Sequence, residues 1–217
     1  MTQHCNVLIG CDQVYYEQWG ILLLKSIKRY NPWMKLHAHI VNPDKKNDLL
    51  KDVDYSFETR EFSSDQNKIG YLQCCRFLAV NNKFTNRDLV MTVDTDTICT
   101  RATSPEYFTE TAKNITILRH HKDRRWLAGM VTFGQNDFRQ QFVKQLHSLP
   151  VESWKPFHDQ NTLQDLSSTY QFVEQNDKDK WMKYGKNAEK GIFMTLKGNQ
   201  KNAQKYLEVY NKIKMGI

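Results

Sequence analysis

The chain has 217 residues, 40% of them apolar, which is enough for one substantial core and too few for two ordinary enzyme domains. The 31 Lys and Arg exceed the 24 Asp and Glu by a formal charge of +7, so nucleic acids, anionic membranes and phosphate-bearing ligands are candidate partners. No apolar run approaches the ~20 residues that a bilayer requires, and the N-terminus lacks the pattern of a secretory signal. We therefore expect one domain over residues 1–217, located in the cytoplasm and without a transmembrane segment.

The predicted elements alternate between strand and helix along the chain. Strands are expected at residues 6–11, 36–41, near 55, 88–93, 115–118 and 130–133. Helices are expected at residues 15–30, 44–51, 69–80, 138–147 and 199–213. This order predicts an α/β fold whose mostly parallel sheet is covered by helices on both faces. In such folds ligands bind beyond the carboxyl ends of the strands, where this sequence places Asp12, Asp94 and Asp96.

The cysteine pattern is typical of reduced thiols. The number is odd, five, with no C-x-x-C pair and no cysteine after residue 99. A disulfide framework or a zinc site requires other spacings. Because free cysteine in cytosolic proteins behaves as a small hydrophobe, we expect these thiols to be mostly buried.

The sequence contains three D-x-D pairs, and their surroundings differ. Those at 52–54 and 177–179 lie in polar or charged stretches, which is typical of a solvated surface. Asp94 and Asp96 follow a buried strand, where two acids are costly unless a cation or hydrogen bonds compensate. Paired carboxylates can bind Mn²⁺ or Mg²⁺. We therefore predict a metal site here, with a strand-capping turn as the alternative.

Six segments within residues 6–201 resemble, in order, the sequence blocks of GT-A glycosyltransferases. The most similar group is family 8, which includes glycogenin and bacterial lipopolysaccharide galactosyltransferases. The segments are NVLIGCDQVYYEQWGILLLKSI, GYLQCCRFLAV, DLVMTVDTDTICT, WLAGMVTF, HDQNTL and FMTLKGNQK. The resemblance implies a Rossmann-like GT-A fold and a Mn²⁺- or Mg²⁺-dependent transfer of a hexose from a UDP-sugar to an acceptor hydroxyl, with retention of anomeric configuration. UDP-glucose and UDP-galactose are the expected donors.

The resemblance assigns roles to residues of the first three blocks. Asp12 and Tyr15 match the positions that meet the uracil, and an aromatic face beside an acid suits a flat base with an N–H donor. Arg76 matches an arginine near the donor sugar and diphosphate, and is expected to act in catalysis. Its alternative role is to pair with a core acid. Asp94 and Asp96 match the metal ligands.

The next blocks supply the expected sugar site. Ala128 and Gly129 match a small pair that lines the sugar pocket, with tight packing as the alternative for the glycine. Asp159 and Gln160 match the catalytic acid and amide around the transferred sugar. The alternative for Asp159 is an N-terminal cap of a helix over residues 161–166.

The last block carries the expected diphosphate loop. Lys197, Gly198 and Lys201 match its residues, since glycine allows close backbone approach and lysine adds a positive charge. The segment 178–217 holds ten lysines against three acids, and so accounts for the whole excess of +7. We expect this segment to meet the diphosphate, an anionic acceptor or an anionic membrane surface.

Three positions depart from the family pattern. Thr195 stands where a histidine usually provides the third metal ligand, so water or His158 could complete the site, or the metal is held more weakly. Leu127 replaces an asparagine of the sugar pocket, and Val14 replaces one that contacts the ribose. The chain is also shorter than typical members, and the part it lacks is expected to serve acceptor recognition.

Two other functions compete with the leading prediction. One is a nucleotide-sugar-binding protein that has lost catalysis, which Thr195 and Leu127 favour. The other is a basic nucleic-acid-binding module, but no RRM, KH or helix-turn-helix block is present, so we expect no nucleic-acid partner. For the enzyme, retention favours same-face attack through an oxocarbenium-like state, with Asp159 as a covalent nucleophile the alternative.

Overall fold

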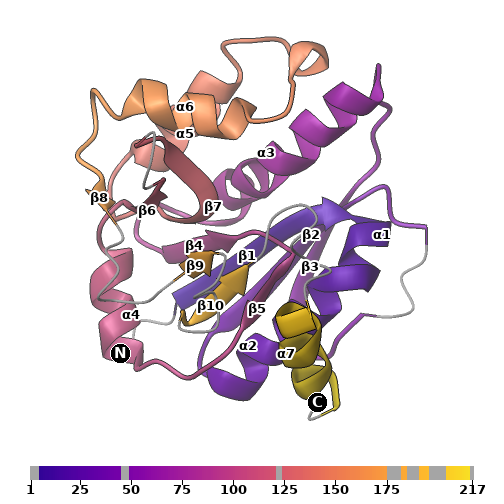
Figure 1. Ribbon diagram of the computed structural model, residues 1–217. Coiled ribbons are helices and arrows are strands. Elements are labelled where there is room, and N and C mark those ends of the chain that lie inside the picture. Colours follow the sequence, from indigo (N-terminus) through magenta and orange to yellow (C-terminus); the bar gives the residue numbers. More distant parts are fainter. Residues whose placement is uncertain are drawn as a thin grey trace.

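Seven strands form the central sheet, in the order β3-β2-β1-β4-β7-β6-β8 (Figure 1). The computed structural model describes residues 5–44, 49–120, 124–174, 182–184, 191–195 and 204–215. The strands are β1 (Cys5–Asp12), β2 (Lys35–Val41), β3 (Val53–Glu58), β4 (Leu89–Val93), β6 (Thr116–Arg119), β7 (Trp126–Thr132) and β8 (Val173–Glu174). The first four are parallel, whereas β7 runs antiparallel to β4 and β6. The expected α/β fold with a mostly parallel sheet is confirmed.

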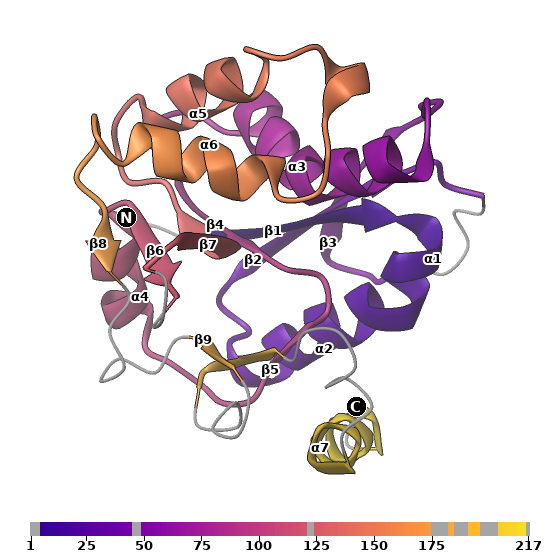
Figure 2. The same ribbon diagram turned by 45° about the horizontal axis from the view of Figure 1, so that its top comes forward.

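Helices cover both faces of this sheet (Figure 2). One face carries α3 (Asp65–Lys83), α5 (Phe138–Leu146) and α6 (His158–Leu166). The other carries α1 (Gln13–Tyr15), α2 (Ile21–Tyr30) and α4 (Pro105–Ala112). A small sheet of β5 (Thr97–Cys99), β10 (Phe193–Thr195) and β9 (Met182–Tyr184) lies on that second side. The last described helix is α7 (Gln204–Met215), whose Tyr210 ring meets the Trp19 ring at a centroid distance of 5.8 Å.

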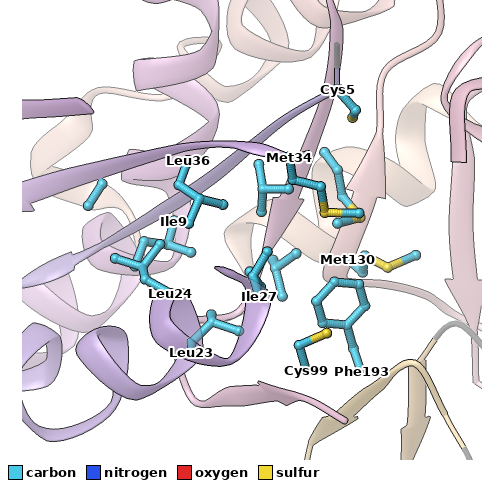
Figure 3. Close-up of a cluster of buried hydrophobic side chains, with 14 of the residues drawn as sticks. Cys5, Ile9, Leu23, Leu24, Ile27, Met34, Leu36, Cys99, Met130 and Phe193 are labelled. Atoms are coloured by element: carbon cyan, nitrogen blue, oxygen red, sulfur yellow. The ribbon is translucent and has the colours of Figure 1, made fainter. Parts of the chain in front are cut away.

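Each face of the sheet has its own apolar core. Ile9 and Leu36 of the sheet pack with Leu24 and Ile27 of α2 and with Phe193 of β10 (Figure 3). The opposite core is rich in aromatic side chains of α3, α5 and the segment before α6, such as Phe77, Phe142 and Trp154. Fully burying one such side chain stabilises the folded state by about 1.5–3 kcal/mol. The two cores therefore fix the helices against the sheet, and with them the ends of the strands.

Most of the predicted elements are present, with shifted boundaries. The predicted helix 69–80 is the centre of the longer α3, which begins after Ser64, whose side chain accepts a hydrogen bond from the Asn67 N–H. The predicted helix 15–30 begins at Gln13 and includes a π-helical turn over Tyr16–Gly20. The predicted closing helix 199–213 corresponds to α7, and its first residues lie outside the described ranges.

At the level of elements, one predicted helix is wrong, and helix α4 and strands β5, β8, β9 and β10 were not predicted. The expected helix 44–51 is wrong where it can be checked, because residues 44 and 49–51 are not helical and 45–48 are not described. Helix α4 was missed, although Ser104 followed by Pro105 is a common start: Ser104 accepts from the Tyr107 N–H and Pro105 occupies the first turn.

The cysteine prediction is confirmed, because all five thiols are free and buried. Burial raises the pKa of Cys75 and of Cys99 to about 12, so both remain protonated at neutral pH. Within the described ranges, no helix is long and apolar enough to cross a bilayer.

Candidate active site

A pocket of about 680 Å³ opens at the carboxyl ends of β1 and β4. Its walls come from β1, α3, the turn after β4, β7 and the start of α6. The residues that the sequence predicted and that line this pocket are Asp12, Tyr15, Arg76, Asp94, Asp96, Ala128, Gly129, Asp159 and Gln160. Pockets of ~300–1,000 Å³ are typical of small-molecule sites. The structure thus brings together predicted residues that are up to 148 positions apart in the chain.

Arg76 connects the two acids at the centre of the pocket. Its Nη2 lies 3.0 Å from Asp94 Oδ1 and 3.3 Å from Asp159 Oδ2, and it donates to the Ala128 carbonyl at 2.9 Å. The arginine is 4% exposed and Asp159 2% exposed. Burial opposes the charge of Arg76, but Asp94 and Asp159 raise its pKa above the ordinary value. Arg76 therefore pairs with a buried acid, as the alternative role expected, and also lines the pocket; its role in catalysis stays a prediction.

Gly10 determines how closely α3 approaches β1. A Cβ at this position would lie 2.8–2.9 Å from the backbone N and Cα and from the Cβ of Arg76. Any larger residue would push α3, and with it the guanidinium, away from the sheet. The sequence signal was an isolated glycine within an apolar strand, which often marks close backbone approach.

Asp12 and Tyr15 form a linked pair at the end of β1. Asp12 caps α1, because its Oδ1 accepts from the Tyr15 N–H at 2.9 Å. Its Oδ2 lies 3.0 Å from Lys68 Nζ on α3, a pocket residue that sequence reasoning missed. The Tyr15 hydroxyl donates to Asp96 Oδ2 at 2.8 Å. One hydrogen-bonded chain therefore joins α3, the end of β1 and the D-x-D turn.

The D-x-D turn ends β4 and borders the pocket with its two carboxylates, while metal binding by them stays a prediction. Its backbone is tied to the sheet, since the Asp94 N–H donates to the Gly129 carbonyl at 2.8 Å and the Thr97 N–H donates to the Asp94 carbonyl at 3.2 Å. Both carboxylates line the pocket and are partly exposed. They supply oxygen ligands, which suit a hard cation such as Mg²⁺ or Mn²⁺.

The surroundings of the turn limit what else could hold such a cation. In the part of the chain that the structure describes, no group of three or more His, Cys, Asp or Glu could hold a metal ion. Thr195 is paired with Thr97 in the small sheet, directly beside the turn, and is buried. His158 points elsewhere, because its Nε2 lies 3.0 Å from the Leu146 carbonyl and its ring lies 5.1 Å from the Trp154 ring. The suggestion that His158 completes the metal site is therefore wrong.

Asp159 lies inside the first turn of α6, not at its cap. The helix begins at His158, and Phe157 occupies the capping position. Asp159 Oδ1 accepts from the Gln160 N–H at 2.8 Å, while Oδ2 faces Arg76. The capping alternative for Asp159 is wrong, and the side chain is held in the pocket by Arg76 instead.

Some predicted residues lie away from the pocket or outside the described ranges. Lys197, Gly198 and Lys201, the expected diphosphate loop, are not among the described residues. Leu127 is buried in β7, and Val14 is 65% exposed.

Solved structures with a similar fold include the glycosyltransferase GlyE of Streptococcus pneumoniae TIGR4. That superposition has a TM-score of 0.53 at 19% identity and covers 82% of this chain and 46% of that chain. The apo form of GlyE gives a TM-score of 0.51 at 17% identity and covers 80% of this chain and 46% of that chain. The chain thus spans about half the length of these structures and has a glycosyltransferase fold. Comparisons with protein-family models and with curated proteins gave no match.

Proposed function

We propose that the chain is a metal-dependent glycosyltransferase of the family 8 type, which transfers a hexose from UDP-glucose or UDP-galactose to an acceptor hydroxyl with retention. The observation that carries the proposal is Arg76, held between Asp94 and Asp159 in a pocket at the carboxyl ends of the strands. A glycosyltransferase fold and an acid–arginine–acid arrangement in a pocket at the carboxyl ends of the strands suit donor binding and departure of a diphosphate.

Different residues of the pocket suit the base and the sugar of the donor. Tyr15 offers an aromatic ring and Asp12 an acceptor for the N–H of uracil, with Lys68 beside it as a donor to a base carbonyl. Ala128 and Gly129 leave room for the hexose against β7, because their side chains are small or absent. Asp94 and Asp96 would hold Mn²⁺ or Mg²⁺, and the metal would supply positive charge that offsets the charge of the leaving diphosphate.

The residues around the anomeric carbon perform the chemical step in this proposal. Arg76 stays charged and stabilises the negative charge that grows on the leaving diphosphate. The Asp159 carboxylate stabilises the positive oxocarbenium-like carbon, and Gln160 orients the sugar hydroxyls. Same-face attack by the acceptor then gives retention. Asp159 as a covalent nucleophile remains the alternative route, and it would require release of the carboxylate from Arg76.

The basic segment at residues 178–217 would meet a negatively charged partner. Lysines of residues 178–217, among them the exposed Lys212 of α7, would meet the diphosphate, an anionic acceptor or an anionic membrane surface. We place the reaction in the cytoplasm, which is supported by five free thiols.

A panel of nucleotide sugars tests the donor class. Each is incubated with the protein and Mn²⁺, with and without a chelator, and release of the nucleoside diphosphate is measured. We expect UDP release from UDP-glucose or UDP-galactose that the chelator abolishes. Release from purine nucleotide sugars alone, or release that a chelator leaves unchanged, would contradict the proposal.

A protein that binds the donor without turnover is the second candidate. Thr195 favours it, since this buried residue stands where the family has a metal-binding histidine. Calorimetry separates the two: UDP binding without UDP release from any nucleotide sugar, with or without added acceptors, would favour the inactive form.

A further inference from the structure

A half-exposed aromatic side chain lies at the pocket beside the proposed catalytic acid. Phe157 lines the pocket, is 52% exposed and precedes Asp159 by two residues. Its φ of 71° lies in the left-handed region, which a bulky residue rarely adopts. Strained residues of this kind persist only where the surroundings hold them, and they concentrate at functional sites.

The segment 151–157 contacts α3 closely at three points. The Phe157 N–H donates to Gln73 Oε1 at 2.8 Å. At Gly70 a Cβ would lie 2.7–2.8 Å from the backbone of Lys155, so only glycine allows this approach. Asn67 Nδ2 donates to the Val151 carbonyl at 2.7 Å. Figure 2 shows the segment between α5 and α6 crossing α3. Phe157 is thus pre-positioned and not a loosely held surface residue.

The surroundings of Phe157 combine an apolar surface with amide groups. Ile69 of α3 lines the same pocket and is 45% exposed. Gln73 and Gln160 line it as well and carry both donors and acceptors. An apolar face bordered by amides suits a pyranose ring, whose C–H bonds form an apolar face while its hydroxyls lie around the edge. A serine or threonine side chain offers no such face.

We propose that Phe157, with Ile69, forms the acceptor subsite and packs against the face of a pyranose ring. The acceptor is then a saccharide whose attacking hydroxyl lies near Asp159. This inference rests on the proposed function, because it needs the donor hexose beside Asp159. Phe157 determines which acceptor is used and takes no part in the chemical step.

Three variants test the subsite. In Phe157→Leu the backbone requirement is the same and the side chain stays apolar, but the ring is lost. Phe157→Tyr restores the ring, and Leu149→Ala removes an exposed apolar side chain outside the pocket. Acceptors are methyl α-D-glucopyranoside, methyl β-D-galactopyranoside and a serine-containing peptide, offered with UDP-glucose or UDP-galactose. Pyranoside binding is also measured without nucleotide by saturation-transfer NMR.

We expect Phe157→Leu to raise the KM or Kd for a pyranoside at least tenfold, with less than a twofold change in the KM for the nucleotide sugar. Phe157→Tyr and Leu149→Ala should behave as the wild type. An unchanged pyranoside KM or Kd in Phe157→Leu overturns the inference, as does transfer to the peptide without pyranoside binding.

The NMR arm separates this inference from the proposed function. If no nucleotide sugar releases UDP, the proposed function fails. Pyranoside binding that depends on the Phe157 ring still supports the subsite in that case, whereas absence of such binding overturns it.

Discussion

Helix α3 contributes one side chain to each of two clusters in which an arginine pairs with carboxylates, and the surroundings of the two clusters differ. Near its start, Tyr71 donates to both carboxylate oxygens of Glu58 at 2.7 Å, and Arg60 Nε lies 2.9 Å from Glu58 Oε1. Farther along, Arg76 lies between Asp94 and Asp159. The members of the Glu58 cluster are absent from the lining of the pocket, whereas those of the Arg76 cluster line it.

The two clusters also differ in burial and in how completely their polar atoms are paired. In the Glu58 cluster, Tyr71 and Arg60 both bind the Glu58 carboxylate, and the Arg60 guanidinium lies 4.4 Å from the centre of the Tyr71 ring. Within the Arg76 cluster, Nε of the arginine is buried without a hydrogen-bond partner among the described residues. Buried pairs are seldom a net gain in stability, so an incompletely satisfied pair that borders a pocket suggests selection for ligand binding.

The largest expected effect comes from exchanging the arginine of each cluster. Arg76→Met leaves two acids without their cation, so we expect UDP release to fall below detection and the free energy of unfolding to fall by about 3–5 kcal/mol. Arg60→Met removes a partly exposed pair and should cost on the order of 1 kcal/mol with UDP release retained.

Urea unfolding and UDP-release assays of both variants check this pair. Equal losses of activity in Arg76→Met and Arg60→Met would remove the distinction between the clusters.

The Glu58 cluster should control acid stability. Hydrogen bonds from His39, Tyr71 and Arg60 outweigh burial and lower the pKa of Glu58 to about 2. A carboxyl with a lowered pKa contributes stability that is complete above its unfolded pKa of ~4.3 and is lost as the pH falls through the folded value. We expect this contribution, about 2–3 kcal/mol, to disappear between pH ~4.3 and ~2.

The test compares unfolding free energies of the wild type and Glu58→Gln at pH 7 and pH 3. The difference between the two proteins should shrink at pH 3, while UDP release at pH 7 stays within twofold. A difference independent of pH would show that the charge of Glu58 contributes nothing.

The smallest expected effect is at the tyrosine that joins the pocket acids. Tyr15→Phe removes the hydrogen bond to Asp96, worth ~1 kcal/mol, so we expect the KM for the UDP-sugar to rise about fivefold. The hydroxyl of the neighbouring Tyr16 is hydrogen-bonded to the Tyr55 hydroxyl, away from the pocket. Tyr16→Phe should therefore lower the free energy of unfolding and leave the KM for the UDP-sugar unchanged. The measurement is the KM for the UDP-sugar of both variants in steady-state kinetics. The same KM in Tyr15→Phe and Tyr16→Phe would exclude a role for Tyr15 in donor binding.

Local patterns in the sequence were sufficient for six of the seven strands of the central sheet and for three acids of the pocket. Apolar runs predicted the strands, and acids that follow strands predicted Asp12, Asp94 and Asp96, because parallel strands end at a common edge. The resemblance to family 8 placed Arg76 and Asp159 in the same site. Its role assignments for the donor stay predictions.

Features that depend on packing could not be predicted. The positive φ of Phe157 occurs together with a hydrogen bond from its N–H to Gln73, 84 residues earlier in the chain. His158 is adjacent to Asp159, yet successive residues of a helix are turned by ~100°, so one side chain faces α5 and the other faces the pocket. Lys68 is identified as a site residue by its ion pair with Asp12 and its place in the pocket wall, neither of which the sequence indicates.

The most direct test of the account compares two D-x-D pairs of the same chain. The double variant Asp94→Ala with Asp96→Ala removes the acids of the pocket, and Asp52→Ala with Asp54→Ala removes an exposed pair of identical spacing. Mn²⁺-dependent UDP release from UDP-glucose and UDP-galactose is measured for both. The account predicts that release is abolished in the first variant and unchanged in the second. Release at the wild-type rate in the first variant would contradict it.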